Sequence, residues 1–116
     1  MNIVITGCSK GIGFELVKIW SKNHKVYGIS RNTEKLESLR ASLSNPANFK
    51  FLSKDIVNLK QHDIKDFIKD SKVDILVNNA GHLINKPFSE IKYEDYRELM
   101  DVNFWGAFNL SQLLVK

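Results

Sequence analysis

Residues 2–13, NIVITGCSKGIG, decide the fold: a short β-branched run leads directly into a glycine-rich loop. Asn2 to Thr6 predicts a strand that ends at Gly7. Apolar residues that share one helical face follow, namely Ile12, Leu16, Ile19 and Trp20. The glycines permit a sharp turn and a close approach to the backbone, and the free N–H groups of a helix that follows attract an anion. The stretch therefore predicts strand, phosphate-binding turn and helix.

The rest of the chain alternates the same two patterns. Apolar runs predict strands over residues 25–30, 49–53 and 73–77, the last a nearly continuous apolar run expected to be buried on both faces. Repeats of three and four predict helices: one capped by Asn32 or Thr33 that carries Leu36, Leu39 and Leu43, one over 59–70, and one from Glu94 to the end. Strands separated by helices require right-handed crossovers. The prediction is one α/β domain over residues 1–116, a doubly wound, Rossmann-like parallel sheet in the strand order 3-2-1-4.

Composition excludes several classes of protein. The chain has 116 residues, a net charge of +4 and a single cysteine. No apolar run is long enough to cross a bilayer, so we expect no membrane partner and a cytoplasmic location. The basic residues are dispersed, which argues against nucleic-acid binding. Cys8 has no His or Cys at ligand spacing, so no metal site is expected.

Four motifs occur in order along the chain. They are T-G-x-x-x-G-x-G at residues 6–13, Asp55-Ile56 after the third predicted strand, N-N-A-G at 78–81 after the fourth, and Val102-Asn103 in the last predicted helix. With these motifs the sequence resembles the short-chain dehydrogenase/reductase family over essentially its whole length. The resemblance implies an alcohol/carbonyl oxidoreductase whose active-site asparagine matches Asn103. It also implies that Asp55-Ile56 holds the adenine ring of a nicotinamide cofactor.

The candidate cofactor-binding residues lie on the loops that follow the strands, where such sheets bind ligands. They are Thr6, Gly7, Ser9, Lys10, Gly11, Ile12, Gly13, Arg31, Asp55, Ile56, Asn79, Ala80 and Gly81. The carboxylate of Asp55 can accept from an adenine amino group, and its alternative role is a helix N-cap. Asn79 to Gly81 form a shelf of small side chains for ribose and nicotinamide, or else simply end a strand.

Charge predicts which cofactor is bound. In NAD-binding sheets an acidic residue ends the second strand, whereas this chain has Ser30-Arg31 there. Arg31 and Lys10 can both reach a 2′-phosphate, and their alternative role is ordinary solvent-facing charge. The predicted cofactor is NADP(H).

The residues that would complete catalysis are missing from this sequence. In the resembled family a serine and a Tyr-x-x-x-Lys motif lie beyond the asparagine, but only thirteen residues follow Asn103 and no Tyr-x-x-x-Lys occurs. We therefore expect a C-terminally truncated domain that is not catalytically competent alone and acts on a substrate only with a C-terminal half. The alternatives are a non-catalytic dinucleotide-binding module and an oligomerising remnant.

Truncation also has a structural consequence. It would leave the fourth strand at an edge of the sheet, where unpaired backbone groups invite association. Phe104, Trp105 and Phe108 are expected to belong either to the core or to an oligomer face. We therefore expect a homo-oligomer.

Overall fold

A four-stranded parallel sheet forms the centre of the molecule. The computed structural model describes residues 1–115, and Lys116 lies outside the described residues. The strands are β1 (Asn2–Thr6), β2 (Lys25–Ser30), β3 (Phe49–Ser53) and β4 (Ile75–Val77), in the order β3-β2-β1-β4 with every pair parallel. This confirms the predicted sheet and its order.

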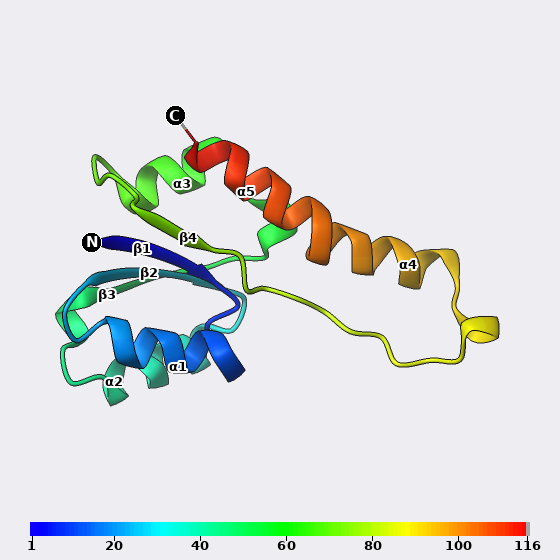
Figure 1. Cartoon of the computed structure of the whole chain (residues 1–116), viewed down its shortest axis with the longest axis horizontal. Helices are drawn as coiled ribbons and strands as arrows, with labels where there is room; N and C mark the ends of the chain where they lie inside the picture. The colour runs from blue at the N-terminus through cyan, green and yellow to red at the C-terminus, as the bar shows by residue number, and fades with distance from the viewer. Residues whose placement is uncertain (116) are drawn as a thin grey trace.

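Helices cover both faces of the sheet (Figure 1). One face carries α1 (Gly11–Trp20) and α2 (Thr33–Ser42), and the other carries α3 (Gln61–Ile68) and α5 (Ala107–Leu114). The alternation of side chains along the strands explains the two layers. In β1, Ile3 and Ile5 belong to the cluster on the α1 and α2 side, whereas Val4 packs with Leu110 on the other.

The remaining elements are short helical turns and one projecting helix. Three 3₁₀ turns are η1 (Pro46–Asn48), η2 (Ile56–Asn58) and η3 (Phe88–Glu90). Helix α4 (Tyr93–Met100) runs into a π-helical segment, η4 (Asp101–Gly106), and then into α5. Among the described residues no helix is both long and apolar enough to span a membrane.

Helix α1 buries only part of the predicted face: Leu16 and Trp20 pack against the core, but the other two residues do not. Ile12 is 72% exposed and Ile19 58% exposed, whereas Gly13 and Val17 are buried. The helix begins beside the loop that precedes it, and a Cβ at position 13 would lie 2.6 Å from the Gly7 carbonyl oxygen. That close approach sets the rotation of the helix, which turns Ile12 and Ile19 outward.

Strand β4 is shorter and more exposed than predicted. It begins at Ile75, not at residue 73, and Ile75 is 37% exposed. It pairs with β1 on one side only, and within residues 1–115 no strand lies on its other side. Its two faces are partly covered, since Val77 packs against the cluster on the α1 and α2 side and Leu76 against the cluster on the other. The predicted burial on both faces is therefore only partial, and the strand forms an edge of the described sheet, as expected for the fourth strand.

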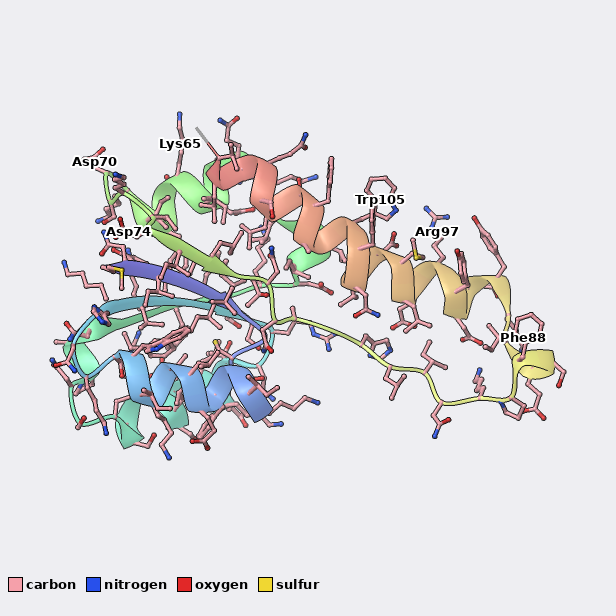
Figure 2. The ribbon with its side chains drawn as sticks, viewed as in Figure 1. Lys65, Asp70, Asp74, Phe88, Arg97 and Trp105 are labelled. Atoms are coloured by element: carbon pink, nitrogen blue, oxygen red, sulfur yellow. The ribbon has the colours of Figure 1, made fainter. Side chains whose placement is uncertain are left out.

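The last predicted helix is interrupted, and part of the chain projects from the sheet. Phe104, Trp105 and Phe108 contact one another edge-on or stacked but are about half exposed, so of the two expected places the core is excluded and the oligomer face stays a prediction. The radius of gyration is 14.9 Å, against about 13 Å for a compact domain of this length. The excess comes from α4 and the segment 78–92, with Phe88 at the far tip (Figure 2).

Candidate functional site

A cavity of about 530 Å³ opens where the strands end. Ligands of open α/β sheets bind outside the carboxyl ends of the strands, so the place is the expected one. Ten of the thirteen predicted cofactor residues line it: Gly7, Ser9, Lys10, Gly11, Arg31, Asp55, Ile56, Asn79, Ala80 and Gly81.

The glycine loop has the conformation that its sequence requires. Gly7 and Gly11 have φ of 67° and 64°, in the left-handed region that favours glycine. A Cβ on Gly7 would also lie 2.8 Å from the Cα of Ala80. Lys10 is the N-cap of α1 but makes no side-chain cap hydrogen bond. The first amides of α1 therefore face this loop without a side-chain cap, as an anion-binding turn requires.

Thr6 joins the glycine loop to the shelf formed by Asn79 and Ala80. Its side chain is fully buried, and Oγ1 accepts hydrogen bonds from the backbone amides of Asn79 (3.0 Å) and Ala80 (2.9 Å). The Asn79 amide Nδ2 donates to the Gly7 carbonyl oxygen at 3.1 Å. Thr6 therefore links the end of β1 to the shelf through two hydrogen bonds, although it does not line the cavity itself.

Two other predicted residues also lie outside the cavity lining. Ile12 points into solvent. Gly13 is buried beneath the loop, where an added Cβ would lie 2.9 Å from the Cα of Cys8. The absence of a side chain at Gly13 therefore lets α1 pack closely against the glycine loop. Direct contact of Thr6, Ile12 or Gly13 with a cofactor stays a prediction.

The cavity wall carries a positive excess. Four cations line it (Lys10, Arg31, Lys35 and Lys54) against the two carboxylates of Asp55 and Glu98.

One of the four cations is already engaged. The Nζ of Lys54 donates to Asp63 Oδ2 at 2.8 Å, and this hydrogen bond, helped by the Lys60 backbone amide, lowers the pKa of Asp63. Within residues 1–115 the side chains of Lys10, Arg31 and Lys35 make no ion pair, so they are the cations that an anionic ligand would meet.

Asp55 and Ile56 lie side by side on the cavity wall. Asp55 Oδ1 accepts from the Val57 backbone amide at 3.1 Å and caps η2, so the helix-cap role weighed from the sequence exists in the structure while Asp55 still faces the cavity. Ile56 packs closely against η4, where a Cβ on Gly106 would lie 3.0 Å from Ile56 Cγ2. The glycine lets the π segment approach this end of the site.

Asn103 lies in the π-helical segment η4 and hydrogen-bonds to the backbone of His82, the residue just after the N-N-A-G motif. Its Oδ1 accepts from the His82 backbone amide and its Nδ2 donates to the His82 carbonyl oxygen, both at 2.8 Å. It does not line the cavity. In this structure Asn103 positions the 81–82 backbone, and a catalytic role stays a prediction.

Eight cavity-lining residues were not anticipated from the sequence: Ile29, Ser30, Asn32, Lys35, Lys54, His82, Glu98 and Val102. Five of them (Ser30, Asn32, Lys54, His82 and Val102) adjoin a predicted residue, so one added position at each motif would have found these five, whereas Ile29 and Lys35 lie further from any predicted residue. Glu98 belongs to α4, and only the position of this helix in the fold brings it to the cavity. Its Oε1 lies 3.4 Å from His82 Nε2.

Two features narrow the chemistry that the site can perform. Burial raises the pKa of the Cys8 thiol to about 12, so the thiolate that acts as a nucleophile is not formed at neutral pH. Among the described residues no three His, Cys, Asp or Glu side chains gather as a metal site would need. The arrangement is suited to holding a phosphorylated, extended ligand.

Known proteins share both the sequence and the fold. The family profile described as short chain dehydrogenase matches residues 1–116. An NADPH-dependent pterin aldehyde reductase of Arabidopsis thaliana is 35% identical over 114 residues, which cover 94% of this chain and 47% of that protein. A Dichelobacter nodosus protein named as a probable NADP-dependent dehydrogenase is 32% identical over 108 residues, covering 89% of this chain and 100% of that protein.

Solved structures share the fold of this chain. The closed form of serine dehydrogenase complexed with NADP⁺ superposes with a TM-score of 0.85 at 25% identity, over 99% of this chain and 48% of that one. With the exception of the Dichelobacter nodosus protein, the chain spans about half the length of these relatives.

Proposed function

The chain belongs to the short chain dehydrogenase family, and from that premise we propose that it is the NADP(H)-binding part of an alcohol/carbonyl oxidoreductase. The single observation that carries the proposal is the cavity at the strand ends. It is lined by the glycine loop, by the Asn79–Gly81 shelf and by three cations that make no ion pair within residues 1–115. The relatives named for NADPH or NADP⁺ support the choice of cofactor.

The residues present fit a phosphorylated dinucleotide. In the proposal the backbone of Gly7 to Gly11 and the amides at the start of α1 bind the pyrophosphate. Arg31 and Lys10 bind the 2′-phosphate through charged hydrogen bonds. Asp55 and Ile56 bind the adenine, and the shelf of Asn79 to Gly81 supports the ribose and nicotinamide. The bound cofactor supplies or accepts a hydride.

We further propose that this chain does not complete the reaction by itself. Reduction of a carbonyl needs an acid that protonates the forming alkoxide. No Tyr-x-x-x-Lys occurs in the sequence, and Asn103 uses both side-chain amide atoms to hold His82. The alternative is a non-catalytic module that binds NADP(H), and the same two observations favour it. A C-terminal half added in trans distinguishes the two, because only the oxidoreductase gains carbonyl-reducing activity.

Calorimetric titration with NADPH and NADH tests cofactor binding. We expect binding of NADPH, with weaker binding of NADH. Arg31→Ala and Lys10→Ala should each weaken NADPH binding about tenfold or more, since charged hydrogen bonds contribute about 1.5–3 kcal/mol. Lys65→Ala is the matched control, because this side chain points from α3 away from the sheet (Figure 2). Absence of heat with NADPH on folded protein would reject the proposal.

The homo-oligomer also stays a proposal. The open edge of β4 and the exposed cluster of Phe104, Trp105 and Phe108 are both surfaces that a second copy could cover. Figure 2 shows Trp105 pointing away from the sheet. Light scattering should give the mass of a dimer or larger assembly, and a monomer mass would contradict this.

A further inference from the structure

The first turn of α2 carries a lysine at the position where α3 and α4 carry an aspartate. Position N3 of a helix favours an acidic or amide side chain that reaches back to the N-cap amide, and the positive end of the helix dipole disfavours a cation there. In α3 and α4 the N3 residues are Asp63 and Asp95, whose carboxylates accept from the N-cap amides at 2.9 and 3.1 Å. In α2 the N3 residue is Lys35.

The backbone that carries Lys35 is held firmly in place. Asn32 caps α2, and its Oδ1 accepts from the Lys35 amide at 3.0 Å. Ser53 Oγ donates to the Arg31 carbonyl oxygen at 3.0 Å and lies 2.6 Å from Thr33 Oγ1. These bonds tie the end of β2 and the start of α2 to β3. The side chains of Asn32 and Thr33 are thus engaged in structural hydrogen bonds, whereas those of Arg31 and Lys35 make no such bond among the described residues.

Lys35 lines the same cavity as Lys10 and Arg31. The three come from different places, namely the glycine loop, the end of β2 and the first turn of α2. Nearby Glu34 does not line this cavity; it lines a second one together with Arg31, Asn32 and Thr33. Within residues 1–115 no carboxylate pairs with Lys35. A side chain at an unfavourable helix position, on a braced backbone and facing a ligand cavity, is the pattern expected where function overrides local preference.

We propose that Lys35 is a specificity-determining residue, the third cation of the 2′-phosphate site, and that it selects NADP(H) over NAD(H). This inference rests on the proposed function. A phosphate monoester carries about 1.5 to 2 negative charges at neutral pH and offers three acceptor oxygens. Three donors from three elements can surround it, whereas the ribose hydroxyl of NAD(H) is neutral and gains little from a third cation.

The decisive variant is Lys35→Gln, because it should weaken the binding of NADPH without lowering the stability of the protein. Glutamine suits N3, so the free energy of unfolding in urea should stay the same or rise. The dissociation constant for NADPH should rise about tenfold, while that for NADH changes less than about twofold. Lys35→Arg, which keeps the charge, should retain the preference for NADPH. Lys65→Gln on α3 removes the same charge far from the cavity and should alter neither constant.

Each other outcome has a definite meaning. If Lys35→Gln leaves the ratio of the NADPH and NADH constants unchanged while the unmodified protein prefers NADPH, the role of Lys35 is refuted and the proposed function stands. If both constants rise equally, Lys35 only supports the fold of the site and the inference fails. If the unmodified protein binds neither nucleotide in calorimetry, the proposed function and this inference fail together.

Discussion

Replacing Thr6 by valine should separate the two halves of the site while leaving the shape of the core intact. Valine puts a methyl group where the hydroxyl was, so no cavity forms. The Ala80 amide, which donates to Thr6 Oγ1 at 2.9 Å, loses that acceptor. The Asn79 amide loses one of two, because it also donates to the Val77 carbonyl oxygen at 3.0 Å. One amide therefore loses its acceptor and one keeps a partner.

The loss of stability in Thr6→Val follows from the number of hydrogen-bond acceptors that the two amides lose. An unsatisfied buried donor costs about 1–3 kcal/mol, and because the Ala80 amide is only partly buried we expect about 1 kcal/mol. The second amide adds little because it keeps an acceptor. For a chain of this size 1 kcal/mol corresponds to roughly 3–6 °C in Tm. Thr6→Val should therefore unfold several degrees earlier. It should also bind NADPH more weakly, because the shelf of Asn79 and Ala80 is no longer fixed to the glycine loop.

Hydrogen exchange at the Ala80 amide is the specific assay, with Thr6→Ser as the matched control. Serine keeps the acceptor and removes one methyl group, which itself costs about 1 kcal/mol. The two variants can therefore have similar stability but should differ at one amide. Protection of the Ala80 amide should persist in Thr6→Ser and be lost in Thr6→Val. An amide that stays protected in Thr6→Val, at unchanged stability, would refute the reasoning.

Three further perturbations test separate features. Gly13→Ala should destabilise the protein by about 1–3 kcal/mol in urea unfolding, because its Cβ would meet the Gly7 carbonyl oxygen at 2.6 Å; an unchanged midpoint would contradict the packing. Cys8, buried with its pKa raised to about 12, should react with a thiol reagent at pH 8 only after denaturation, and fast labelling of folded protein would contradict its burial. The pKa of Asp63 lies below its ordinary 3.8 because Lys54 donates to it, so this carboxylate adds stability above that pH and loses the contribution as the pH falls through the lowered value. Asp63→Asn should therefore make stability fall less between about pH 5 and pH 2, and an unaltered acid profile would show that the pair does not contribute.

The local pattern of the sequence determined the elements and their order. The bounds of β1, β2 and β3 agree with the predicted strands, because short runs rich in β-branched or aromatic residues, bounded by turn residues, favour strands. The strand order followed from the handedness of crossovers, which does not depend on side-chain detail. The glycine loop and the positions of Asp55 and Asn79 on the cavity were likewise predictable, since residues that end parallel strands meet at one edge of the sheet.

Only the tertiary structure decided which face each element presents and which side chains meet. Periodicity placed Ile12 and Ile19 toward the core, but the contact of Gly13 with the loop rotates α1 and leaves both exposed. The hydrogen bonds from the Asn79 and Ala80 amides to Thr6 span 73 and 74 positions of the sequence. The hydrogen bonds between Asn103 and the His82 backbone come from a π-helical segment. Lys35 has the pattern of an ordinary surface lysine, and only the fold shows that it lines the same cavity as Arg31 and Lys10. The physical reason is that local propensity acts over a few residues, whereas the direction of each side chain and its distant partners depend on how the strands, loops and helices pack in the folded chain.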